Sequence, residues 1–165
     1  NERHCGRLRI SVSPSLYDYA VRLLSRRSYG SEELRRKLQR RAGKEEVDKV
    51  IAQLEQIGYL NDEEYAFQRA KFRREVRRWG NHRIARDLTR LGLSARIVKL
   101  TLGKLEKECP EAQSFQQVTQ AWMKSSGPPT SISQLKKLYV QFIRLGYSSE
   151  HVRSGLQEYF DKIGW

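Results

Sequence analysis

Apolar residues recur along the chain at the three- and four-residue spacing of amphipathic helices. Ser15 has a side chain suited to capping the first of these helices, and Tyr29-Gly30 and Ala42-Gly43 interrupt the pattern afterwards. No segment alternates between apolar and polar residues as a half-buried strand would. The pattern therefore predicts an all-α fold. Its first three helices are expected over residues 16–27, 31–41 and 44–57.

The clearest helix signals lie between Gly58 and Gly92. Asn61 is expected to cap a helix that ends near residue 78, with three carboxylates in the first turn, where the helix dipole favours negative charge. Trp79-Gly80 breaks that helix, Asn81 is expected to cap the next one, and Gly92 ends it. The inward faces are predicted to consist of Tyr65, Phe72, Val76 and Trp79 in the first helix and Ile84, Leu88 and Leu91 in the second.

The helix breaks and the apolar positions recur at a shift of fifty residues, with Tyr29-Gly30 matching Trp79-Gly80. The other matches are Leu34 with Ile84, Leu38 with Leu88, Val47 with Ile97, Arg36 with Arg86, and Arg40 with Arg90. A fainter third copy, at a shift of fifty-four, matches Leu138 with Ile84, Phe142 with Leu88 and Arg144 with Arg90, but places Val140 against Arg86.

This periodicity predicts three tandem three-helix repeats in a curved, crescent-like array, in which each unit buries apolar surface on its neighbours. The expected division is a tail at residues 1–14 followed by repeats at 15–60, 61–108 and 109–165.

Charge adds a candidate function. The 165 residues carry a net charge of +13, and residues 61–108 hold thirteen Lys and Arg against seven Asp and Glu. A face kept for solubility alone usually mixes the two signs, so the arginine-rich faces are candidate binding surfaces for a polyanion or an acidic protein. Phe67 lies on the basic side of its helix and is either a partner-facing aromatic or, as we favour, packed against a neighbouring unit. The candidate binding residues are Arg36, Arg40, Arg73, Arg77, Arg78, Arg83, Arg86 and Arg90.

Several other classes of protein find no support in the sequence. It has no apolar run long enough to span a membrane and no apolar signal segment, and its two cysteines, Cys5 and Cys109, do not form a C-x-x-C pair. The histidines His4, His82 and His151 lack metal-ligand spacing. Neither a G-x-x-x-x-G-K-[ST] loop nor a G-x-S-x-G elbow is present. We therefore expect a cytoplasmic, monomeric protein that is not an enzyme and holds no cofactor.

Four stretches of the sequence resemble the RecX family, bacterial regulators of the RecA recombinase. They are RRSYGSEELRRKLQRR at residues 26–41, GYLNDEEYA at 58–66, RRWGNHRIARDLTRLGLS at 77–94 and IRLGYSSEHVRSGL at 143–156. The resemblance covers most of the chain from residue 15 onward. It implies tandem three-helix repeats that bind the RecA–DNA filament and inhibit RecA ATPase, recombinase and co-protease activity in DNA repair and the SOS response.

The residues and the resemblance lead to one hypothesis, in which the basic faces bind the RecA–DNA filament. One alternative is a sequence-independent DNA-binding array that competes with RecA for DNA, which electrostatics alone would support. A second alternative is a membrane-surface protein, but that function needs apolar faces that the core already requires.

Overall fold

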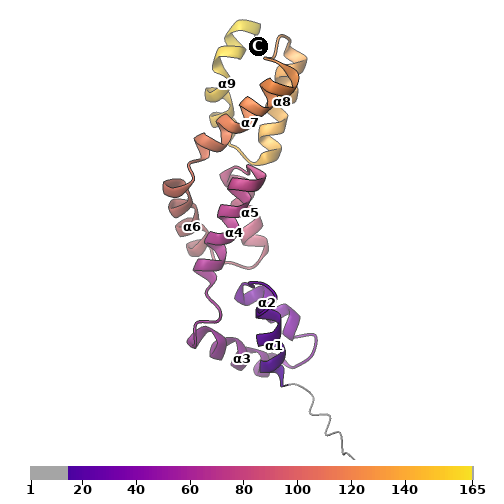
Figure 1. Cartoon of the computed structure of the whole chain (residues 1–165), viewed down its shortest axis with the longest axis vertical. Helices are drawn as coiled ribbons and strands as arrows, with labels where there is room; N and C mark the ends of the chain where they lie inside the picture. Colours follow the sequence, from indigo (N-terminus) through magenta and orange to yellow (C-terminus); the bar gives the residue numbers. More distant parts are fainter. Residues whose placement is uncertain (1–14, 165) are drawn as a thin grey trace, which may run out of the picture.

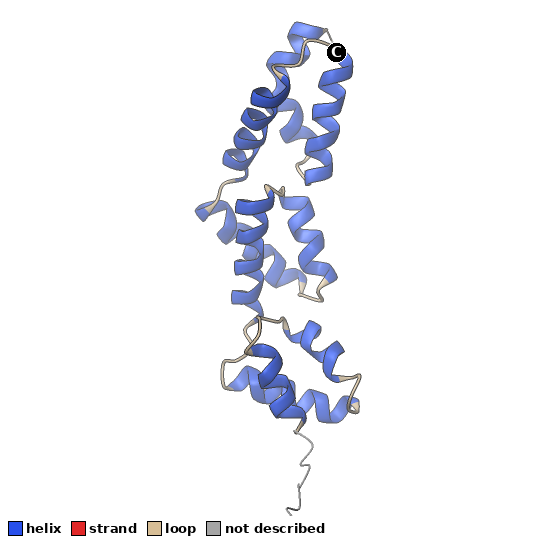
Figure 2. Ribbon diagram, turned by 45° about the vertical axis from the view of Figure 1, so that its right-hand side comes forward, coloured by secondary structure: helices blue, strands red, loops and turns tan. Residues whose placement is uncertain are grey.

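The computed structural model describes residues 15–164, in which every regular element is an α-helix. The expected tail at residues 1–14 lies outside that range. The helices are α1 (Leu16–Leu24), α2 (Ser31–Leu38), α3 (Lys44–Gln56), α4 (Asp62–Arg77), α5 (Asn81–Arg90), α6 (Ala95–Glu108), α7 (Glu111–Ser126), α8 (Ile132–Leu145) and α9 (Ser149–Ile163). The all-α prediction is confirmed (Figure 2).

The helices form three groups of three, here called unit 1 (α1–α3), unit 2 (α4–α6) and unit 3 (α7–α9). Each group has a hydrophobic cluster of its own, which includes Leu38 in unit 1, Leu88 in unit 2 and Phe142 in unit 3. The units follow one another along the long axis of the molecule, with the middle unit displaced to one side, so the array is long and shallowly bowed (Figure 1). Such an array presents a long surface built from successive units.

Local capping explains most helix ends. Ser15 and Asp18 form a reciprocal capping box at the start of α1, and the Asn61 side chain accepts a hydrogen bond of 3.0 Å from the Glu64 N–H at the start of α4. Gly92 follows α5 with a left-handed φ of +91°, which glycine adopts without steric cost. The prediction for Asn81 was wrong, because Gly80 is the N-cap and Asn81 is the first helical residue.

The predicted inward face of α4 was also wrong in part. Phe72 and Val76 are 51% and 59% exposed, whereas Ala66, Ala70 and Arg74 are buried. The helix packs closely against α6, and alanine side chains permit that approach where larger apolar groups would prevent it.

Phe67 is buried, as we favoured, but it packs within its own unit. The Lys104 ammonium of α6 lies 3.8 Å from the centre of the Phe67 ring, a cation–π contact. This side chain is therefore part of the α4–α6 packing in unit 2.

Units 2 and 3 are joined by a head-to-tail helix contact. The N–H of Gly80 donates to the carbonyl of Leu145 at 2.8 Å, and the N–H of His82 donates to that of Gly146 at 3.1 Å. The last carbonyls of α8 thus satisfy N–H groups at the start of α5. A Cβ on Gly80 would collide with the Gly146 carbonyl oxygen, so this contact requires a residue without a side chain.

A carboxylate from the following unit supplies a second type of contact at both junctions. Asp62, the first residue of α4, accepts a 2.7 Å hydrogen bond from the N–H of Ser31 at the start of α2. Glu111, the first residue of α7, accepts a 2.6 Å bond from the N–H of Asn81 at the start of α5. Each carboxylate caps the second helix of the preceding unit, where the helix dipole also favours negative charge.

Candidate partner-binding surface

Four of the eight predicted binding arginines are exposed at or just after the second helices of units 1 and 2. Arg36 lies on α2 and Arg40 in the turn that follows it, whereas Arg86 and Arg90 lie one turn apart on α5. The end of α5 adjoins α2, because Gly92 contacts the Glu32 side chain and lies beside the Arg36 guanidinium. We call these four residues, Arg36, Arg40, Arg86 and Arg90, the arginine stripe.

Two of the predicted residues make contacts within the fold. The guanidinium carbons of Arg73 and Arg83 lie 4.4 and 4.1 Å from the ring centre of Trp79. Arg83 also donates a 2.9 Å hydrogen bond to the backbone carbonyl of Arg144 in unit 3. Both side chains are half-buried, so they fix the helix break and the unit 2–unit 3 junction.

Asp87 of α5 is a buried carboxylate that organises the arginines around it. It contacts Arg69 at 2.9 Å, Arg73 at 3.4 Å and Arg90 at 3.1 Å. Burial alone would raise the pKa of the Asp87 carboxyl, but the hydrogen bond from Arg69 and the charges of Arg69 and Arg73 outweigh burial and lower that pKa. Asp87 therefore stays ionised and holds Arg90 at one end of the arginine stripe.

Arg77 and Arg78 lie apart from the arginine stripe, beside a hollow between α4, α7 and α8. Its volume is about 500 Å³, and Val118 and Trp122 of α7 line it with the two arginines. Arg78 ends α4 with a left-handed φ of +55°, and its carbonyl accepts a 3.0 Å hydrogen bond from the Tyr147 hydroxyl. The eight arginines therefore do not form a single face.

Sequence reasoning missed a buried polar cluster between units 2 and 3. Arg74 is 1% exposed, donates to the Asn81 side chain, and lies 3.7 Å from Glu111. The Nδ1 atom of His151 lies 3.6 Å from the same carboxylate. Burial raises the pKa of the neighbouring Tyr147 phenol to about 12. No sequence signal marks this cluster, because Arg74 lies among arginines that are mostly exposed or half-buried, and Glu111 is thirty residues from Asn81.

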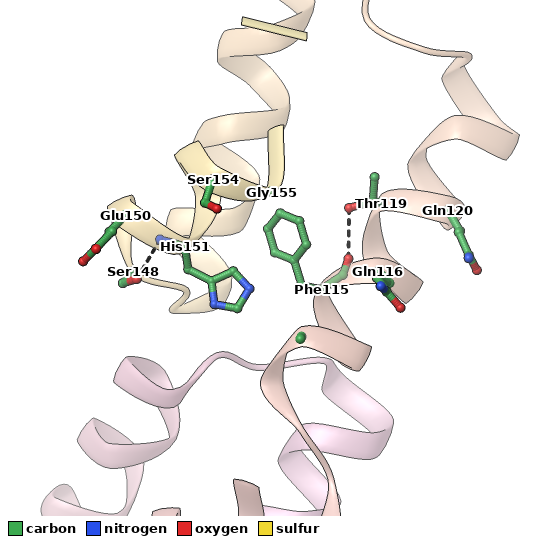
Figure 3. A pocket seen from close by; sticks show the side chains of 10 residues that line it. Phe115, Gln116, Thr119, Gln120, Ser148, Glu150, His151, Ser154 and Gly155 are labelled. Carbon is green, nitrogen blue, oxygen red and sulfur yellow. Dashed lines mark hydrogen bonds between the residues drawn. The ribbon is translucent and has the colours of Figure 1, made fainter. Parts of the chain in front are cut away.

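A further hollow, of about 780 Å³, lies between α7 and α9 (Figure 3). The rings of Phe115 and His151 face one another there with their centres 5.0 Å apart, while the Glu150 side chain points away from both. The Thr119 hydroxyl donates to the Phe115 carbonyl at 3.0 Å. The two titratable side chains in the lining, His151 and Glu150, diverge, so the hollow has no acid–base pair of its own.

Residues 15–164 contain no group of three His, Cys, Asp or Glu side chains placed to hold a metal ion. Within the same range, no helix is long and apolar enough to cross a bilayer. Across the described part of the chain, the fold and its surface define a helical-repeat protein whose basic side chains are presented by successive units.

The family follows from comparison with known proteins. Residues 17–54 match the model described as "RecX, first three-helix domain". The regulatory protein RecX of Deinococcus radiodurans is 36% identical over 109 residues, which cover 66% of this chain and 52% of that protein. The regulatory protein RecX of Thermus thermophilus is 36% identical over 90 residues, which cover 54% and 62%. The chain thus spans about half to three fifths of these relatives, and its similarity is to the RecX family.

The fold agrees with that assignment. The crystal structure of RecX from Lactobacillus salivarius superposes with a TM-score of 0.74, covering 87% of this chain and 93% of that one at 17% sequence identity. At that identity the similarity concerns the fold, and it agrees with the prediction of an all-helical repeat array.

Proposed function

We propose that this protein binds the RecA–DNA filament in the bacterial cytoplasm, as a monomer and without a cofactor, and inhibits RecA ATPase, recombinase and co-protease activity. Similarity to regulatory proteins of the RecX family supports a regulatory role. The main support for the location of the contact surface is the arginine stripe, in which the same repeat position presents an exposed guanidinium in two successive units.

The long array suits a filament better than a compact partner. Units that follow one another along an axis can contact successive RecA protomers, and each arginine of the stripe can then bind a carboxylate or a phosphate through two parallel N–H groups. Holding neighbouring protomers in one arrangement would oppose the conformational steps of ATP hydrolysis. The same contact would obstruct addition of a protomer or entry of a second duplex.

The alternative function is sequence-independent binding to DNA, with inhibition by competition for the lattice. The net charge of +13 favours it. Aromatic stacking gives it little support, because Tyr29 is buried with the Arg27 guanidinium 3.8 Å from its ring centre, and Trp79 is half-buried between Arg73 and Arg83.

The deciding experiment is to titrate RecA ATP hydrolysis on single-stranded DNA with this protein at physiological salt, while measuring its binding to the same DNA without RecA. Inhibition at concentrations well below those that coat bare DNA would support the filament as target. Inhibition that appears only when the DNA is saturated would instead mean competition for phosphate, and the proposal would fail.

A charge reversal locates the surface. Arg90 contacts the buried Asp87, so the variant changes two other arginines of the stripe, Arg40→Glu with Arg86→Glu. Inhibition should weaken by about tenfold or more, since two charged contacts to the filament are lost. The matched control, Lys99→Glu with Lys107→Glu, makes the same charge change at exposed positions of α6. An equal loss of inhibition in both variants would mean that net charge, and not the arginine stripe, determines binding.

A further inference from the structure

The outer face of α8 departs from the pattern of the other two units. Val140 occupies the repeat position of Arg86 and is 43% exposed, and the aliphatic Ile132 is exposed two turns earlier. The helix contains no Asp or Glu, while Lys136, Lys137 and Arg144 lie among these aliphatic groups. Unit 3 thus replaces an arginine position with an apolar centre surrounded by cations.

This face lines an extended groove. A hollow of about 900 Å³ runs along α8 from Ile132 to Leu145. It shares Gln141 and Leu145 with the hollow of about 500 Å³ that Arg77 and Arg78 line across the junction with unit 2. We call the two adjoining hollows the α8 groove. Its lining includes five cationic side chains and no carboxylate: Arg77, Arg78, Lys136, Lys137 and Arg144.

The lining chemistry selects one kind of occupant. Five cations without a carboxylate among them favour an anionic partner, and exposed aliphatic groups favour apolar side chains on that partner. Single-stranded nucleic acid fits less well, because its bases stack on aromatic faces, and Val140 and Ile132 have none. Trp122 is the one aromatic residue of the lining, and its indole N–H is buried.

We propose that the α8 groove binds a segment of the RecA protomer in which carboxylates lie beside aliphatic side chains. Val140 and Ile132 contact the aliphatic groups, and the flanking lysines and arginines contact the carboxylates. This inference rests on the proposed function, because it names a second contact with the same filament, separate from the arginine stripe.

The test restores the arginine that units 1 and 2 carry at this repeat position. Val140→Arg should weaken inhibition of RecA ATPase by about fivefold or more, because it removes the apolar centre and adds a cation, while leaving binding to bare single-stranded DNA unchanged or stronger. The control is Leu100→Arg, which adds the same charge at an aliphatic residue of α6 that is 52% exposed and lies outside the groove. Both sites are exposed, so both variants should keep the far-UV circular dichroism of the parent.

The possible outcomes are distinct. If Val140→Arg strengthens both DNA binding and inhibition, the groove binds nucleic acid and the inference is overturned. Equal inhibition by Val140→Arg and Leu100→Arg would also overturn it, with the proposed function intact. If the parent protein fails to inhibit RecA at sub-saturating levels, the proposed function fails and this inference falls with it.

A second measurement identifies the bound segment. A photoreactive benzophenone amino acid in place of Val140 should cross-link to RecA within filaments, and mass spectrometry should find the adduct in a peptide that contains both carboxylates and aliphatic residues. Capture of DNA, capture of a basic RecA peptide, or no adduct under conditions of full inhibition would each refute the assignment.

Discussion

Replacing Glu111 with alanine should destabilise the protein far more than replacing its counterpart Asp62, although both carboxylates cap a helix of the preceding unit. Glu111 accepts bonds of 2.6 and 3.0 Å from the backbone and side-chain nitrogens of Asn81 and lies 3.7 Å from the guanidinium of Arg74, which is 1% exposed. Asp62 caps the Ser31 N–H at 2.7 Å.

The magnitudes follow from these contacts. Loss of a helix cap costs about 0.5–2 kcal/mol. Loss of the anionic partner of a buried cation costs about 3–5 kcal/mol, because the remaining charge stays desolvated. At Glu111 the lost cap and the lost ion partner involve the same neighbouring residues, so the two free-energy costs do not add. We therefore expect about 3–5 kcal/mol for Glu111→Ala and about 1 kcal/mol for Asp62→Ala. Glu111→Gln keeps one acceptor oxygen for the Asn81 N–H but loses the charge and the second acceptor, and its cost should lie between those of the two alanine variants.

The assay is urea unfolding followed by both circular dichroism and tryptophan fluorescence, so that separate unfolding of unit 3 appears as a difference between the two curves. Equal losses for Glu111→Ala and Asp62→Ala would show that Arg74 does not depend on Glu111 for its charge balance. The reasoning would then be wrong, and water or another group would have to satisfy the buried guanidinium.

Three further changes test other parts of the structure. Asp87→Asn should cost about 1–3 kcal/mol of stability at neutral pH. It should also flatten the dependence of stability on acid, because a carboxyl whose pKa is lowered in the fold stabilises the protein above its unfolded pKa and loses that effect as pH falls. Urea unfolding midpoints between about pH 2 and pH 6 measure this dependence. The parent should lose stability as pH rises from about 10 to about 12, because folding raises the pKa of the Tyr147 phenol to about 12. Tyr147→Phe has no phenol and should not show this loss, which unfolding measurements across that pH range would test. Gly80→Ala should cost about 1–3 kcal/mol in thermal unfolding, because its Cβ meets the Gly146 backbone, whereas Gly43→Ala has open space and should change little.

The local signals in the sequence predicted the helices well, because capping and helix termination depend on neighbouring residues. Ser15, Asn61 and Gly92 act at the helix ends where their chemistry placed them. The inward face of α4 was mispredicted because large apolar residues dominate a helical projection, whereas close packing on α6 selected Ala66 and Ala70. Apolar size is a poor guide where two helices approach closely.

The candidate site shows a similar limit. The repeat pattern identified the exposed arginine positions at α2, in the turn after it and on α5. Sequence alone could not separate those side chains from Arg73 and Arg83, which contact Trp79. The burial of Arg74 and the role of Asp87 depend on residues brought together by the fold. Charge along a chain indicates a polar environment, but its ion-pair partners are set by tertiary structure.

The head-to-tail contact between α5 and α8 has a mechanical consequence. Main-chain hydrogen bonds join units 2 and 3, and the two glycines at the contact leave no side chain that could rotate to relieve a bend. Side-chain bonds join units 1 and 2: the Ser31 N–H donates to Asp62, and the Tyr65 hydroxyl donates to Glu33. The molecule should therefore behave as a stiff rod made of units 2 and 3, with the more compliant unit 1 at its amino-terminal end. Unit 1 can then follow changes in the spacing of partner protomers while units 2 and 3 move as one body.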